Sequence, residues 1–219
     1  MKHPYRWLIY GLGMMVLALG ITLNTKTGLG VSPIISVAYS VSQIFSLNFG
    51  DMTFILYVLF VAVQLALRKR SEWVATLFQI VVSLIFSRLL NLYDAMIPYR
   101  NEAHSLPANL ALLAVAILLT GLGIAMTVNM RLVPNPGDGI VQAIAEKIGR
   151  GQGFTKNVFD IGCVCVTAAV GLCCAGKVIG IGVGTIAAMV GVGRAVALVN
   201  RFCKDNMLAA AGLTANGKV

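Results

Sequence analysis

The sequence predicts an all-α polytopic membrane protein with six transmembrane helices, and three observations support this fold class. The chain of 219 residues is 58% hydrophobic and 11% charged, whereas soluble domains carry about 25% charged residues. Its apolar runs approach the roughly 20 residues that a membrane-spanning helix needs. Its net charge is +9, but the basic residues gather at the ends of these runs. This distribution is typical of membrane topology and argues for the lipid bilayer, not nucleic acid, as the main partner.

Six apolar runs are the expected spans. Five have the length of a transmembrane helix, and the second run is short, so its helix is expected to begin earlier, near Asn48. The first run is longer than a secretory hydrophobic region and lacks a cleavage site of small residues, so we interpret it as a retained helix. The six runs cover residues 7–25, 52–67, 73–92, 110–130, 158–176 and 178–199.

The basic residues also predict the orientation of the spans. With six crossings and both termini cytoplasmic, and with Arg88 and Arg194 within helices left aside, twelve lysines and arginines lie inside, and Lys26, Arg100 and Lys177 lie outside. Counting eight crossings would move the basic run 68–70 outside, against the positive-inside rule. Six crossings are therefore the better prediction.

The two halves of the chain repeat the same order of segments. Gly20 recurs 103 positions later as Gly123, and Pro33 recurs as Pro136. Because each half has three crossings, two tandem copies must lie in opposite orientations across the membrane. Inverted repeats of this kind form many transporters, with the solute site where the repeats meet. The expected domains are a first three-span repeat (1–100), a second three-span repeat (101–205) and a cytoplasmic tail (206–219).

Each half is broken after its first span by a small polar residue and a proline, Ser32-Pro33 and Asn135-Pro136. Serine and asparagine are favoured N-caps because their side-chain oxygens accept hydrogen bonds from free backbone N–H groups, and proline suits the first helical position. An extra short helix is therefore expected to start at Pro33, and another at Pro136 or Asp138. Glycine permits tight or left-handed backbone, which is expected at Gly28, Gly30, Gly137 and Gly139.

Two interpretations of these short helices remain open. They can re-enter the membrane from opposite faces, since broken backbone at membrane depth survives where protein or a watery cavity surrounds it. They can instead lie in the interface as connectors. Residues 34–45 are apolar enough to re-enter, whereas residues 140–149 have the amphipathic pattern of an interfacial helix.

Ionisable residues within spans are costly, at ~2.5–3.5 kcal/mol near a helix centre. Arg88 and Arg194 lie four or five residues from the ends of their predicted spans, where they can snorkel to the interface; their matched positions equally suggest a shared structural or anion-binding role. Asp160 follows Lys156 at the spacing of a helical ion pair, which predicts that the two residues pair. The alternative role of Asp160 is as a proton or cation site. Asp138 is expected to cap its short helix with its carboxylate or to present charge to a cationic ligand.

Several segments carry a family resemblance. "GVSP" (30–33), "FQIVVSLIFSRLLN" (78–91), "PNPGDGI" (134–140) and "GIGVGTIAAMVGVG" (180–193) resemble the YczE-type membrane proteins of the YczE/YyaS/YitT group. The resemblance covers nearly the whole chain and implies a bacterial inner-membrane protein with several spans. It carries over no catalytic residue. Asn91 stands where similar proteins are expected to have an acidic residue, which argues against proton coupling at that position.

The predicted function is transport of a small solute between the two breaks. No nucleotide-binding loop, paired catalytic carboxylates or catalytic triad occurs in the sequence, so neither an enzyme nor a cofactor is expected. An anionic group suits two helix N-termini and two arginines better than a cation does. The alternative is a non-transporting accessory protein that supports another membrane-bound system, and a homo-oligomer or a membrane-protein partner stays open. The candidate substrate-binding residues are Ser32, Pro33, Asn135, Pro136, Asp138, Arg88, Arg194 and Asp160.

Overall fold

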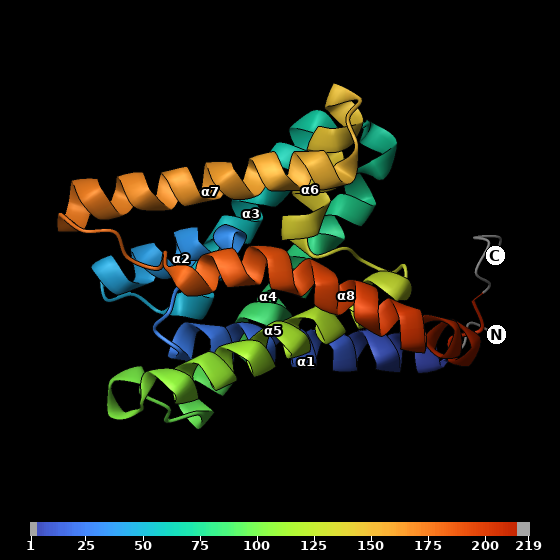
Figure 1. Cartoon of the computed structure of the whole chain (residues 1–219). Coiled ribbons are helices and arrows are strands. Elements are labelled where there is room, and N and C mark those ends of the chain that lie inside the picture. The colour runs from blue at the N-terminus through green and yellow to red at the C-terminus, as the bar shows by residue number, and fades with distance from the viewer. Residues whose placement is uncertain (1–3, 214–219) are drawn as a thin grey trace.

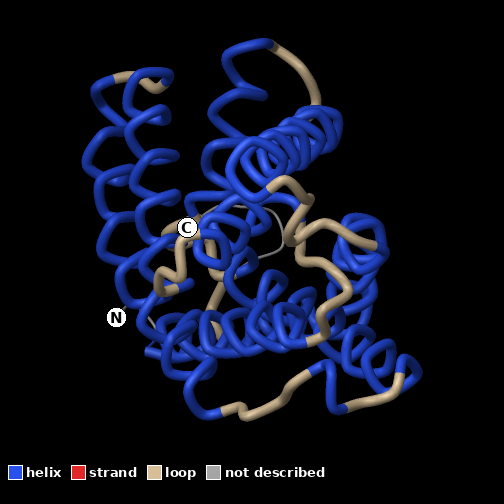
Figure 2. Tube along the Cα trace, turned by 90° about the vertical axis from the view of Figure 1, so that its left-hand side faces the viewer, coloured by secondary structure: helices blue, strands red, loops and turns tan. Residues whose placement is uncertain are grey.

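The computed structural model describes residues 4–213, and this part of the chain consists of helices and short loops without a strand (Figure 2). Six helices are long and apolar enough to cross a membrane, which confirms the prediction of an all-α membrane protein with six candidate spans. These helices are α1 (Pro4–Lys26), α3 (Phe49–Leu67), α4 (Trp73–Met96), α5 (Leu106–Asn129), α7 (Gln152–Ala175) and α8 (Val183–Ala210).

Two short helices complete the fold, one after the first long helix of each half. They are α2 (Pro33–Ile44) and α6 (Pro136–Ile148), and single 3₁₀ turns, η1 (Arg70–Glu72) and η2 (Asn101–Ala103), precede α4 and α5. The prediction of a short helix after each break is thus confirmed.

The ends of two long helices show how well hydropathy locates boundaries. Helix α3 begins after Asn48, as expected, because the Asn48 side chain accepts a hydrogen bond from the Asp51 N–H at 3.0 Å. Helix α8, in contrast, continues eleven residues past the end of its apolar run, and Leu208 near its end is buried. Residues 206–210 therefore belong to α8, and residues 214–219 lie outside the described residues.

Helices α1 and α5 make the most extensive contact among the described helices, with glycines on both sides. A Cβ atom at Gly20 would lie 2.6 Å from the Thr120 nitrogen, and one at Gly123 would lie 2.5 Å from the Leu17 nitrogen. Small residues let helix backbones approach closely inside a membrane. The two glycines that revealed the repeat thus make the same contact, each with the opposite helix.

In Figure 1, α1 and α5 lie along the lower part of the molecule and the remaining helices lie above them. Helix α4 packs on α1, and α8 packs on α5. Helix α2 lies against α3 and α7, and α6 lies against the same two helices. Both short helices are therefore enclosed by long ones along part of their surface, which positions their N-termini inside the molecule.

The first break adopts left-handed backbone, as predicted, with φ angles of 67° at Gly28 and 103° at Gly30. The same expectation is wrong for Gly137 and Gly139, which lie within α6. A Cβ atom at Gly139 would lie 2.6 Å from the Gln64 side-chain oxygen. The second break therefore uses glycine for close packing against α3 rather than for a turn.

Candidate functional site

The N-termini of the two short helices meet inside the molecule. Each helix has its proline in the first turn, as predicted. A Cβ atom at Gly137 would lie 3.4 Å from the Ile34 side chain, at ordinary van der Waals distance. The two breaks, far apart in the sequence, thus lie together.

The caps of the two helices differ. Asn135 caps α6 as expected, because its side-chain oxygen accepts a hydrogen bond from the Gly137 N–H at 3.0 Å. Ser32 precedes α2 but makes no side-chain capping bond, so that expectation is wrong. The expectation that the Asp138 carboxylate caps α6 is also wrong, because Asn135 occupies the cap position and Asp138 lies within the first turn of the helix.

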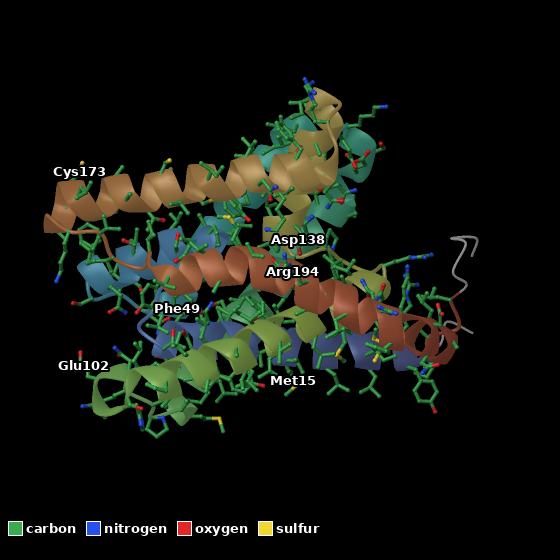
Figure 3. All side chains as sticks on the ribbon, in the orientation of Figure 1. Met15, Phe49, Glu102, Asp138, Cys173 and Arg194 are labelled. Atoms are coloured by element: carbon green, nitrogen blue, oxygen red, sulfur yellow. The ribbon has the colours of Figure 1, made fainter. Side chains whose placement is uncertain are left out.

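A cavity of about 370 Å³ lies between the two breaks and the facing sides of α7 and α8. It brings together five of the predicted site residues, which are Ser32, Pro33, Asn135, Asp138 and Asp160. Pro136 lines a much smaller cavity that shares Leu17, Tyr57 and Asn135 with the larger one. Figure 3 shows Asp138 near the middle of the molecule.

The cavity has one polar side and one apolar side. Helices α6 and α7 supply the charged and amide groups, and the N-terminal end of α2 adds the Ser32 hydroxyl. The lining from α1, α5 and α8 is mostly apolar, with the Thr120 hydroxyl as its polar group. The apolar lining residues on these three helices are Leu17, Ile21, Ile124, Ala188, Met189, Val192 and Val196.

The predicted ion pair of Lys156 with Asp160 is confirmed. The Lys156 ammonium lies 3.2 Å and 3.3 Å from the two carboxylate oxygens of Asp160. The Asp160 side chain is 4% exposed, whereas that of Lys156 is 45% exposed. Both residues line the cavity, so the pair forms part of its wall.

Neither arginine lines the cavity. Arg88 on α4 pairs with Asp51 on α3 at 3.0 Å, with both side chains about half exposed. Arg194 is exposed on α8 (Figure 3). The expectation that Arg194 lies near a helix end is wrong, because α8 continues to Ala210. The structure thus does not bring the two arginines together at the breaks.

Two buried glutamines that sequence analysis missed hold α6 in place. The side-chain amides of Gln64 on α3 and Gln79 on α4 donate to each other at 3.1 Å and 3.0 Å. Gln64 also lies 3.4 Å from the carbonyl oxygen of Pro136, to which it donates. Neither residue is charged, and the signal in the sequence was a lone glutamine in each of two apolar runs.

The N-terminal end of α3 is bonded to α4. The Gly50 N–H donates to the Asn91 side-chain oxygen at 3.0 Å, and a Cβ atom at Gly50 would lie 2.5 Å from the Ser87 carbonyl oxygen. Asn91 thus serves as a hydrogen-bond acceptor between the two helices. The Asp51–Arg88 pair lies beside this contact.

Helices α7 and α8 make almost no contact along their described lengths. Figure 1 shows them diverging from the loop 176–182 that joins them. The cavity occupies the space between them, lined by Gly153, Asn157 and Asp160 on α7 and by Val192 and Gly193 on α8.

Comparison with known proteins places these features in a family. The model of a family of unknown function, DUF6198, matches residues 4–201. The uncharacterized membrane protein YczE of Bacillus subtilis (strain 168) is 24% identical over 157 residues, which cover 71% of this chain and 70% of that protein. The uncharacterized protein YyaS of the same organism is 23% identical over 158 residues, 72% of this chain and 75% of that protein. No solved structure matches this chain significantly.

Proposed function

We propose that this chain, which belongs to the DUF6198 family and is a YczE-type membrane protein, transports a small solute across a bacterial inner membrane. In this proposal two inverted three-span repeats, residues 1–100 and 101–205, enclose the cavity. The broken helices α2 and α6 enter it from opposite faces, and both termini are cytoplasmic. The observation that carries the proposal is the cavity where the two breaks meet.

Contacts that recur when each residue is replaced by its counterpart 103 positions away support the inverted repeat. Gly20 of α1 contacts Thr120 of α5. The counterpart of Gly20 is Gly123 and the counterpart of Thr120 is Leu17, and these two residues also contact each other. Ile34 and Gly137 are themselves counterparts and touch each other. Reciprocal pairs and a self-related pair are what a two-fold axis between two copies produces.

The contacts of the short helices follow the same relation. Ser36 on α2 and Thr167 on α7 share a hydrogen bond of 2.7 Å between their hydroxyls. Their counterparts are Gly139 on α6 and Gln64 on α3, which pack against each other. Each short helix therefore contacts the second span of the opposite repeat at the same position.

The difference between the halves supports transport rather than a closed scaffold. Alternating access in inverted-repeat transporters arises when one repeat rocks against the other around a fixed site. Here α3 and α4 are joined, whereas their counterparts α7 and α8 are apart and the cavity lies between them. This arrangement corresponds to a state that is closed on one side and open on the other.

The lining of the cavity does not support the predicted preference for an anionic solute. The anionic preference was based on two helix N-termini and two arginines. Both N-termini line the cavity, but neither Arg88 nor Arg194 does. We therefore do not retain that preference.

A single cysteine at Asn157, in a background without the five native cysteines, tests the proposal. Asn157 lines the cavity, so a membrane-impermeant maleimide is expected to label it from one face of sealed vesicles. Solutes that slow this labelling are then tested for uptake into proteoliposomes. Uptake above that of protein-free liposomes is the expected result. Protection without uptake of any protecting solute would contradict transport and favour the accessory role.

A further inference from the structure

We infer that the cavity binds the ammonium group of an organic amine and that the Asp138 carboxylate is its counter-ion. This inference uses the cavity named in the proposed function. It concerns binding, and it can hold or fail independently of whether the bound amine crosses the membrane.

Asp138 has a carboxylate without a partner. Within the described residues 4–213, no ion pair and no side-chain hydrogen bond involves Asp138, and Asn135 performs the capping of α6 in its place. The Asp138 side chain lines the cavity. An ionised group away from bulk water is costly unless a charged or hydrogen-bonding partner compensates it. A bound cation supplies that compensation.

Within the described residues, no cationic side chain forms an ion pair with Asp138. Lys156, the only cationic side chain in the cavity lining, has both of its hydrogen bonds to Asp160. Arg88 pairs with Asp51 outside the cavity, and Arg194 does not line it. The lining therefore holds two carboxyl groups and one ammonium group, a formal excess of one negative charge.

The wall opposite Asp138 predicts the rest of the ligand. It is formed mostly by apolar side chains of α1, α5 and α8, together with Thr120, and apolar atoms make up most of the lining. Apolar surface stabilises a ligand in proportion to the area that is removed from water. An amine with one apolar side fits this division, with its ammonium group toward α6 and its hydrocarbon toward α8.

The position of Asp138 is fixed by its surroundings. Gln64 donates to the carbonyl oxygen of Pro136, and Gly139 packs on the paired amides of Gln64 and Gln79. Asn135 caps the helix just before Asp138. A carboxylate held by a rigid helix loses little conformational freedom on binding, which favours affinity.

Four phenyl compounds of similar size test the inference by thermal unfolding of the purified protein in detergent: phenethylammonium, phenylalanine, 2-phenylethanol and phenylacetate. A ligand that binds only the folded state raises the unfolding temperature in a concentration-dependent way. Stabilisation by one or both ammonium compounds, but not by the alcohol or the anion, is expected. A response to phenethylammonium identifies a simple amine, and a response to phenylalanine alone identifies a zwitterion. Stabilisation by the anion or the alcohol, or by none of the four, overturns the inference.

Two variants make the test specific. Asp138→Asn keeps the shape and removes the charge, so the apparent affinity for the ammonium compound should fall at least tenfold. Asp205→Asn removes a carboxylate of the same type from an exposed position on α8, outside the cavity, and should leave affinity unchanged. Equal affinity in Asp138→Asn and the parent protein overturns the inference. Binding that is lost in Asp138→Asn, combined with no uptake into proteoliposomes, contradicts only the transport proposal.

Discussion

The second and third spans of the two halves differ in one respect, and this difference bears most directly on function. Helices α3 and α4 are joined by the Gly50–Asn91 hydrogen bond and the Asp51–Arg88 ion pair. Their counterparts α7 and α8 diverge and enclose the cavity. The first spans, α1 and α5, in contrast, make reciprocal contacts. The α1–α5 centre of the molecule is thus symmetric in its contacts. Its two sides, the α3–α4 side and the α7–α8 side, are not.

The sequence explains part of this asymmetry. The third spans match at an offset of 106 positions, so Arg88 has its counterpart in Arg194. At the offset of 103 positions that relates the second spans, the counterpart of Asp51 is Phe154, which is 59% exposed. An arginine on α8 therefore has no carboxylate at the corresponding place on α7. In our proposal the two sides exchange conformations during transport, and the ion pair favours closure of the α3–α4 side.

The largest expected effect concerns the symmetric centre. Gly20→Ala and Gly123→Ala each place a Cβ atom against the backbone of the opposite helix, and overpacking of this kind costs about 1–3 kcal/mol. We expect both to lower the free energy of unfolding by similar amounts, measured by denaturant titration in detergent. Gly11→Ala is the control, because nothing lies within 4 Å of a Cβ atom there. A large loss at only one of the two glycines would contradict reciprocal packing.

A smaller effect is expected where the short helices contact the opposite repeat. Gln64→Leu leaves the buried Gln79 amide unpaired, which costs at least about 1 kcal/mol. Thr167→Val, at the corresponding place on α7, removes a hydroxyl hydrogen bond of the kind worth about 0.6 kcal/mol in a membrane protein. The same unfolding measurement should rank the two variants in this order. Restoration of stability in the double variant Gln64→Leu/Gln79→Leu would confirm that the unpaired amide is the cause.

The smallest expected effect concerns the separation of α7 from α8. Phe154→Asp gives Arg194 a carboxylate at the place where Arg88 has Asp51, and an exposed ion pair contributes less than about 1 kcal/mol. Closure of α7 toward α8 should then slow maleimide labelling of a cysteine at Asn157 by up to about fivefold. Phe154→Asn, which changes size in the same way without adding charge, should label at the parent rate. Equal slowing in both variants would show that charge is not the cause.

The sequence predicted local features better than contacts between distant segments. The helix starts at Pro33 and Pro136 follow from local backbone rules, and the Lys156–Asp160 pair follows from helical spacing, so these predictions were confirmed. The place of Asp138 depends on Asn135 already filling the cap position, and the pairing of Arg88 with Asp51 depends on how α3 meets α4. The cavity itself depends on the angle between α7 and α8, which no local pattern encodes.

The most direct test measures the two sides in the same preparation, by electron-spin resonance distances between labels in liposomes. Leu47 with Leu92 reports on the α3–α4 side, and Arg150 with Leu198 are the corresponding positions on the α7–α8 side; all four are exposed. The account predicts a shorter distance for the first pair, and an opposite change at the two pairs when Phe154→Asp is introduced. Equal distances at both pairs, or distances that change together, would contradict it.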